Sequence, residues 1–262
     1  MNTKLKILRA LSMFVLMSGA GNISVWCRIP GADELLKKID AAQTLGTDIS
    51  AQVSFLQVRP VQGTNRYSME YYRRDADDAF LLIMLAPRVE AGNGYLKTGD
   101  SFWMYRRNTR TFQHINRDEN IGGTDVKSGD MESKKLSDQF KAKLDSDGKE
   151  IISETALGAQ KTWKITLIAK VDNVTYPMQV MWVAQETYLV LKVENYSRSG
   201  TLMVTQLFPK YMPVQGKYIP SVFYSIDNFE KGNMTVTEIS SVNLSKIPDH
   251  IFTKPYLESR SK

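Results

Sequence analysis

The 262-residue sequence predicts a mainly β fold with a few helices (α+β), built on one antiparallel sheet. Apolar and polar residues alternate through many short stretches, which is typical of strands with one buried and one wet face. Turn residues such as Gly92-Asn93-Gly94 and Gln215-Gly216-Lys217 separate these stretches. Connections this short join antiparallel strands, because parallel pairing requires long crossovers. We therefore expect a sheet of about ten strands.

Residues 1–31 are predicted to be an export signal or leader. Lys4, Lys6 and Arg9 precede the apolar core at 10–17, and small residues follow at 18–20. This order of basic, apolar and small residues is that of a secretory signal. An uncleaved membrane anchor is the alternative, but the apolar core is short for a bilayer of roughly 30 Å.

The single cysteine, Cys27, is a candidate site of lipidation if processing makes it the mature N-terminus. The bulky Trp26 before it departs from the small residue that lipoprotein processing favours. The alternative is a cysteine that is removed with the signal or stays unpaired. One cysteine and two histidines, His114 and His250, also leave little material for a metal site, so none is expected.

The basic charge of the chain comes largely from its leader. The formal net charge is +6, from 34 basic and 28 acidic residues. Four of the basic residues precede Asp33, and without them 30 basic residues face 28 acidic ones, a net charge of +2. A domain so close to neutral is not expected to bind nucleic acid, which usually requires a concentrated basic face.

The first element expected in the body is a helix over 32–42. Leu35, Leu36, Ile39 and Ala42 share one face at helical spacing, and Gly46 follows as a stop signal.

The spacing then changes to a period of two, which predicts strands. The alternating stretches are 49–55, 67–71, 163–171, 178–184, 189–193, 222–226 and 234–237. Residues 79–86 are continuously apolar, which predicts a strand covered on both faces.

One segment interrupts the strands. Residues 116–131 are polar and glycine-rich, and 132–144 show weak helical spacing through Leu136, Phe140 and Leu144. We expect a loop and a helix inserted midway along the sheet. No internal repeat is visible, so 32–262 are interpreted as a single domain.

A sheet of this size must curl, close or split to bury its apolar face. Two helical segments, each roughly 10 Å across, cannot fill its concave side, which suggests a cavity. The alternative is a closed barrel or a sandwich with a filled core.

Several stretches resemble the LolA-like family of outer-membrane lipoprotein-sorting proteins. These stretches are 32–40, Gly99–Tyr105 (GDSFWMY), the loop 122–126 leading to Asp130, and 247–252 with Leu257-Glu258. The resemblance spans about residues 32–258, although Arg106 replaces the usual proline after the tyrosine.

The resemblance implies an unclosed antiparallel β-barrel wrapped around helices, with a hydrophobic cavity for acyl chains. It also implies a periplasmic carrier of a diderm bacterium that shields a lipid or lipoprotein during transfer, with an inner-membrane exporter as a partner. A membrane tether through Cys27 is part of this hypothesis, and the protein is expected to be a monomer without cofactors.

The lipid-binding candidates are apolar residues of the alternating strands. They are Val53, Phe55, Tyr67, Met69, Trp103, Tyr105, Trp163, Ile165, Met178, Val180, Trp182, Leu189 and Leu191. Binding of hydrocarbon is driven by removal of apolar area from water. The alternative for each of them is an ordinary packed core.

No catalytic residue is expected. Gly99-Asp100-Ser101 resembles the nucleophile block of GDS-type lipases, but the Asp-x-x-His of those enzymes is missing, and Asp249 and His250 are adjacent instead. The tripeptide is better explained as a hairpin turn. The alternative to a carrier is an interaction module that docks onto an exporter or an envelope-stress component without cargo.

Overall fold

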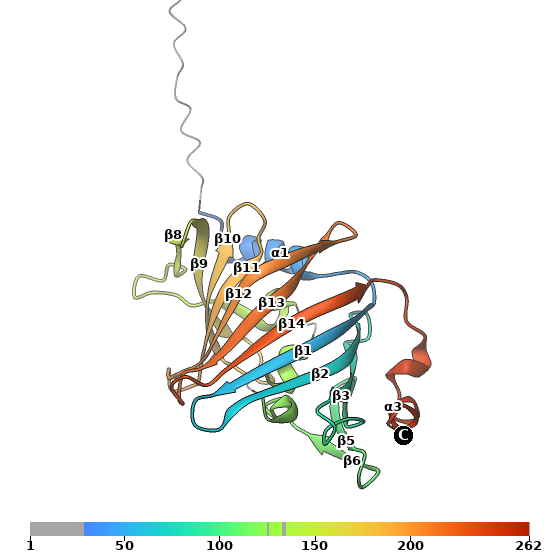
Figure 1. The fold of residues 1–262 in the computed structure, drawn as a ribbon. Helices are drawn as coiled ribbons and strands as arrows, with labels where there is room; N and C mark the ends of the chain where they lie inside the picture. Colours follow the sequence, from blue (N-terminus) through green and yellow to red (C-terminus); the bar gives the residue numbers. More distant parts are fainter. Residues whose placement is uncertain (1–28, 125, 133–134, 262) are drawn as a thin grey trace, which may run out of the picture.

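The computed structural model describes residues 29–124, 126–132 and 135–261, and these form one strongly curved antiparallel sheet (Figure 1). The described residues contain 14 strands in the order β6-β5-β4-β3-β2-β1-β14-β13-β12-β11-β10-β9-β7, and β8 also pairs with β9. The sheet is open, as predicted, because its two ends do not pair with each other. The expectation of about ten strands was too low, since short strands such as β7 carry too few residues to show a period.

The strand bounds follow the predicted stretches and extend them. The strands are β1 Ile49–Arg59, β2 Gly63–Arg74, β3 Ala79–Ala86, β4 Gly94–Thr98, β5 Ser101–Arg106, β6 Thr111–Ile115, β7 Phe140–Ala142, β8 Ile152–Leu157, β9 Gln160–Ala169, β10 Met178–Ala184, β11 Val190–Tyr196, β12 Leu202–Val214, β13 Lys217–Asp227 and β14 Met234–Asn243. The helical elements are α1 Ala32–Gln43, η1 Ile121–Gly123, η2 Ser128–Met131, α2 Leu136–Gln139, η3 Asp249–Phe252 and α3 Lys254–Arg260.

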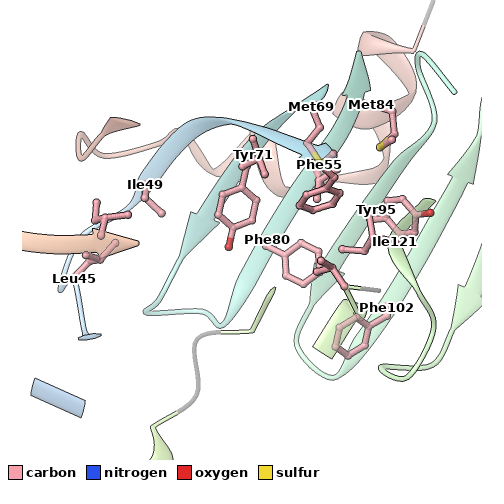
Figure 2. Close-up of a cluster of buried hydrophobic side chains, with 14 of the residues drawn as sticks. Leu45, Ile49, Phe55, Met69, Tyr71, Phe80, Met84, Tyr95, Phe102 and Ile121 are labelled. Carbon is pink, nitrogen blue, oxygen red and sulfur yellow. The ribbon is translucent and has the colours of Figure 1, made fainter. Parts of the chain in front are cut away.

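A first concave cluster of buried side chains lies on the inner face of β1 to β5. Phe55, Phe80, Tyr95 and Phe102 point into one interior from four strands (Figure 2). Ile121, from the segment between β6 and β7, joins them, so this inserted segment fills part of the concave side. Burial of a side chain such as Phe contributes roughly 1.5–3 kcal/mol, which explains why the sheet curves around this cluster.

A second concave cluster joins α1 to the other half of the sheet. Leu35, Leu36 and Ile39 are buried in it together with Trp163 and Ile165 of β9. The predicted helix over 32–42 is confirmed. The Asp40 carboxylate accepts hydrogen bonds from the backbone N–H groups that begin α2, and this fixes the inserted segment against α1.

The C-terminal segment covers the opposite, convex face near β3 to β5. Leu257 of α3 and Phe252 of η3 pack against Leu81 and Ile83 of β3 in a convex cluster. The alternate residues of β3, Phe80 and Leu82, face the first concave cluster. The prediction that 79–86 is covered on both faces is therefore confirmed.

The helix expected over 132–144 was wrong for most of its length. Among the described residues of this stretch, only Leu136–Gln139 is helical, and Phe140–Ala142 forms strand β7 beside β9. Phe140 and Ala142 point into the second concave cluster, which a strand with period two places on one face.

The predicted signal at 1–31 and Cys27 fall almost entirely outside the described residues. None of the described helices is long and apolar enough to cross a membrane.

Candidate functional site

A cavity of about 290 Å³ lies on the concave face, between the C-terminal end of α1, the loop around Met131, and strands β1, β2 and β12 to β14. Its apolar wall comes largely from the sheet. Val53 of β1 stands directly opposite Ile239 of β14, and both line the cavity. The rings of Phe208 and Phe223 stack beside them with centroids 5.5 Å apart. The cavity suits a flexible hydrocarbon chain, because the side chains named here are apolar and Val53 also belongs to the first concave cluster.

Charged groups at one end of this cavity already have partners. Arg73 lines the cavity, and its Nε lies 2.8 Å from Asp75 Oδ1. Burial raises the pKa of Asp130 to about 6, and the hydrogen bond donated by the Lys127 backbone N–H opposes this rise. The cavity thus ends in an ion pair and in a carboxyl group that ionises near neutral pH.

A second hollow, of about 580 Å³, lies at the loops near the edge of the sheet. Asp118, Lys127, Asp172 and Arg198 line it. It is larger than the first cavity, but four charged side chains in its wall make it a poor site for hydrocarbon. The apolar cavity is therefore the candidate site.

Six of the predicted lipid-binding residues face the concave side. Val53, Phe55, Tyr67 and Met69 belong to the first concave cluster, and Val53 lines the apolar cavity. Trp163 and Ile165 lie in the second concave cluster, where α1 covers them. A ligand in the cavity would thus touch the wall around Val53, whereas Trp163 and Ile165 pack against the protein's own helix.

Trp103 and Tyr105 lie on the convex face, opposite to the cavity. They pack in the convex cluster near α3, and the Lys254 ammonium lies 3.0 Å from the centre of the Trp103 ring. Their neighbour Phe102 faces inward instead. The strand that the resemblance implied here is confirmed, and the C-terminal segment buries its second apolar face.

Met178, Val180 and Trp182 also point away from the concave side, because their neighbour Met181 lies in the second concave cluster. Trp182 stands opposite Lys164 and Lys192 in the two neighbouring strands. The two ammonium groups lie 4.9 and 4.3 Å from the centre of its ring.

Leu189 directly precedes β11 and Leu191 is its second residue, beside a register shift that follows Trp182. Leu189 is buried there and Leu191 is half-buried. Neither residue lines the apolar cavity.

The cavity residues missed by the sequence analysis come mainly from β12 to β14. Phe208, Phe223 and Ile239 were not predicted, although they form much of the apolar wall. In β13, the predicted alternation of Val222, Tyr224 and Ile226 marks the convex face, and Phe223 between them points inward. A signal was present in Phe223, an aromatic residue out of phase with the alternation of 222–226, whereas Phe208 lies outside every stretch that was predicted to alternate.

Gly99 and Asp100 form the turn between β4 and β5, as predicted, with Gly99 in the left-handed region at φ +55°. The two histidines pack on aromatic rings: His114 on Trp103 and His250 on Tyr256. Within the described part of the chain, no group of three or more His, Cys, Asp or Glu side chains is placed to hold a metal ion.

A family model described as "Uncharacterized protein" matches residues 76–259, more than half of the chain. The comparison with curated proteins finds no match.

Three solved structures have the same architecture at low sequence identity. A LolA superfamily protein from Nitrosomonas europaea is 20% identical, with a TM-score of 0.74 over 87% of this chain and 99% of that one. A protein described as an outer membrane lipoprotein-sorting protein domain, from Vibrio parahaemolyticus, is 20% identical, with a TM-score of 0.75 over 87% and 98%. A DUF1329 family protein from Desulfovibrio piger is 18% identical, with a TM-score of 0.75 over 86% and 97%. The predicted resemblance to LolA-like proteins is therefore confirmed at the level of the fold.

Proposed function

We propose that this chain, which belongs to the family whose model matches residues 76–259, is a lipid carrier. Its LolA-like fold supports this proposal. It shields an acyl chain of a lipid or lipoprotein in the concave cavity while the cargo crosses the cell envelope. It does so by binding alone, without a covalent step.

The observation that carries this proposal is the apolar cavity between β1, β12, β13 and β14. Transfer of each CH₂ group from water into such a site contributes about 0.8 kcal/mol, so a single acyl chain supplies enough free energy for binding. The volume of about 290 Å³ is near the lower end of ligand pockets, which run from roughly 300 to 1,000 Å³. It favours one acyl chain over a lipid buried whole.

The proposed location is the periplasm. The LolA-like fold and the basic, apolar and small residues at 1–20 support export. A tether through Cys27 and an inner-membrane exporter that loads the carrier complete the hypothesis, with the protein acting as a monomer. Intact-mass measurement of the mature protein tests the tether, because acylation of Cys27 adds the mass of its lipid.

A cavity-filling variant tests the proposal. Ile239→Trp places a large ring in the cavity, and the delipidated variant is expected to lose uptake of a fluorescent fatty acyl probe that the wild type binds. Ile226→Trp is the matched control, because Ile226 neighbours Ser225 on β13 and faces the convex side. Equal probe binding by the Ile239→Trp variant, or no uptake by the wild type, would overturn the carrier proposal.

Exposed apolar side chains favour a docking module as the second candidate. Val61, between β1 and β2, is 97% exposed, and Phe229, after β13, is 64% exposed. The two turns are close, since a Cβ added at Gly232 would meet the Pro60 ring at 2.6 Å. Under this alternative, capture of a membrane partner survives Ile239→Trp and is lost with Val61→Asp and Phe229→Asp together.

A further inference from the structure

A row of uncharged polar side chains crosses the concave face beside the apolar cavity. We call it the polar row; its members are Gln179, Asn195, Gln206, Ser225, Thr235 and Thr237. The strand register places them next to one another from β10 to β14. Gln179 stands opposite Asn195, Gln206 opposite Ser225, and Ser225 opposite Thr235.

The polar row faces inward because its members share the side of their strands with residues of the two concave clusters. Thr237 lies opposite Phe55 of the first cluster, and Gln206 lies opposite Val193 of the second. Four members are almost fully enclosed: Asn195 and Thr237 are 1% exposed, and Ser225 and Thr235 are 0% exposed. Polar side chains at such positions are unusual, since their neighbours on the same face are apolar.

In the described part of the chain, some polar atoms of the polar row have hydrogen-bond partners and others have none. Gln179 Nε2 donates to Asn195 Oδ1 at 3.0 Å, and Asn195 Nδ2 donates to Gln206 Oε1 at 3.4 Å. Among the described residues, no group forms a hydrogen bond with Ser225 Oγ, Thr237 Oγ1 or Gln179 Oε1. A buried hydroxyl without a partner is costly, so these atoms mark a place where another polar group fits.

The polar row meets the cavity at two residues. Gln206 and Thr237 both line it, at the end away from Arg73. Strand β1 shows how far Arg73 lies from Thr237 in the cavity wall. Ile49 pairs with Arg73, whereas Phe55, six residues later in the strand, pairs with Thr237. The Arg73 charge already faces Asp75, whereas Thr237 Oγ1 has no partner in the described structure.

We infer that the polar row binds the uncharged polar part of the cargo, an ester or amide with a neighbouring hydroxyl, while the acyl chain lies in the cavity. This inference rests on the proposed carrier function and narrows its substrate class. Hydroxyl and amide side chains both donate and accept hydrogen bonds, which matches an acylglycerol or an acylamide. A phosphate or a free carboxylate would instead require cationic donors, and the polar row contains none.

Three pyrene-labelled probes with the same tail test the inference: an acylglycerol, the free fatty acid, and the hydrocarbon without a headgroup. The delipidated wild type is expected to bind the acylglycerol tightest. Ser225→Ala and Thr237→Val are each expected to weaken acylglycerol binding about fivefold to tenfold and to leave hydrocarbon binding unchanged. Thr237→Ser keeps the hydroxyl and should keep the affinity.

Ser240→Ala is the matched control, because Ser240 is an exposed residue of the same strand as Thr237. If the hydrocarbon binds but neither variant weakens the acylglycerol, or if the free acid binds tighter, the inference is overturned while the carrier function stands. If no probe binds to the wild type, the carrier function itself fails. Circular dichroism melting of each variant identifies one that has merely unfolded. If Thr237→Val unfolds, acylglycerol binding by Thr237→Ser tests the role of the hydroxyl, and a loss of affinity in that folded variant overturns the inference.

Discussion

The guanidinium of Arg74 binds the carboxylate of Asp48, with its Nε 3.3 Å from Asp48 Oδ2. The same guanidinium donates to Asp249 Oδ1 at 2.7 Å and to the carbonyl oxygen of Ile247. Asp48 in turn accepts a hydrogen bond from the backbone N–H of Ile247 at 2.7 Å. This pair therefore ties the start of β1 and the end of β2 to the chain that leads from β14 to α3.

Loss of one partner of this pair should destabilise the fold. Asp48→Asn removes the one largely buried carboxylate that pairs with Arg74 in the described structure and leaves the exposed Asp77 and Asp249 as its counter-charges. The variant is expected to reduce the free energy of unfolding by about 2 kcal/mol. Urea denaturation measures the loss. Asp100→Asn, in the exposed turn after Gly99, is the control and should change the free energy of unfolding little. If Asp48→Asn reduces it no more than this control, the Asp48–Arg74 ion pair contributes little to stability.

The docking of α3 depends on Leu257, which is fully buried in the convex cluster. Leu257→Ala is expected to lower the free energy of unfolding by about 3 kcal/mol, through lost apolar burial and the cavity that remains. Leu144→Ala, at an exposed leucine, should cost far less. Thermal unfolding compares them, and similar midpoints would mean that α3 contributes little to stability.

The buried carboxyl group of Asp130 should make stability depend on pH. Its pKa of about 6 in the folded protein lies above its ordinary value of 3.8. The folded state then binds more protons between these values, so this contribution is fully present below pH 3.8 and is lost as the pH rises through 6. Unfolding free energies measured from pH 4 to 7 should fall less steeply in Asp130→Asn than in the wild type. Parallel curves would contradict the raised pKa.

Trp182 and Phe223 should differ in their effect on acyl binding. Trp182→Leu is expected to leave the affinity for a fluorescent acyl probe within about twofold, because the ring packs between two lysines on the convex face. Phe223→Leu removes a ring from the cavity wall and should weaken binding more. Probe titration of both variants decides, and a large loss in Trp182→Leu alone would place the site on the convex face.

Most strands could be predicted from the sequence, because each depends on its own alternating residues. The sequence did not predict which face of each strand lies on the concave side of the sheet. Strand β5 (SFWMYR) is apolar on both faces, with Phe102 inward and Trp103 outward. The outward face is buried only because α3, about 150 residues later, packs over it. Strand β10 is ambiguous in the same way, since the ammonium groups of Lys164 and Lys192 lie over the Trp182 ring on its outward face.

Of the predicted lipid-binding residues, only Val53 lines the cavity. Much of the wall comes from β12, where the alternation is broken, and from β13, where the predicted alternation marks the convex face. Strand β12 contains Pro209 and two register shifts around Lys210, which interrupt the alternation that would reveal Phe208. The polar row was missed for a related reason. Ser225 and Thr237 look like the wet side of their strands, whereas pairing with Thr235 and Phe55 turns them inward.

The two short strands that pair with β9 protect the edge of the open sheet against aggregation. Strand β8 pairs with residues 160–165 of β9, and β7 pairs with residues 167–169. Together they pair with one edge of β9, a ten-residue strand. Without them this edge would expose a long row of unpaired backbone N–H and C=O groups. The outermost strands at this end are then only three and six residues long, and short edge strands limit pairing with another chain.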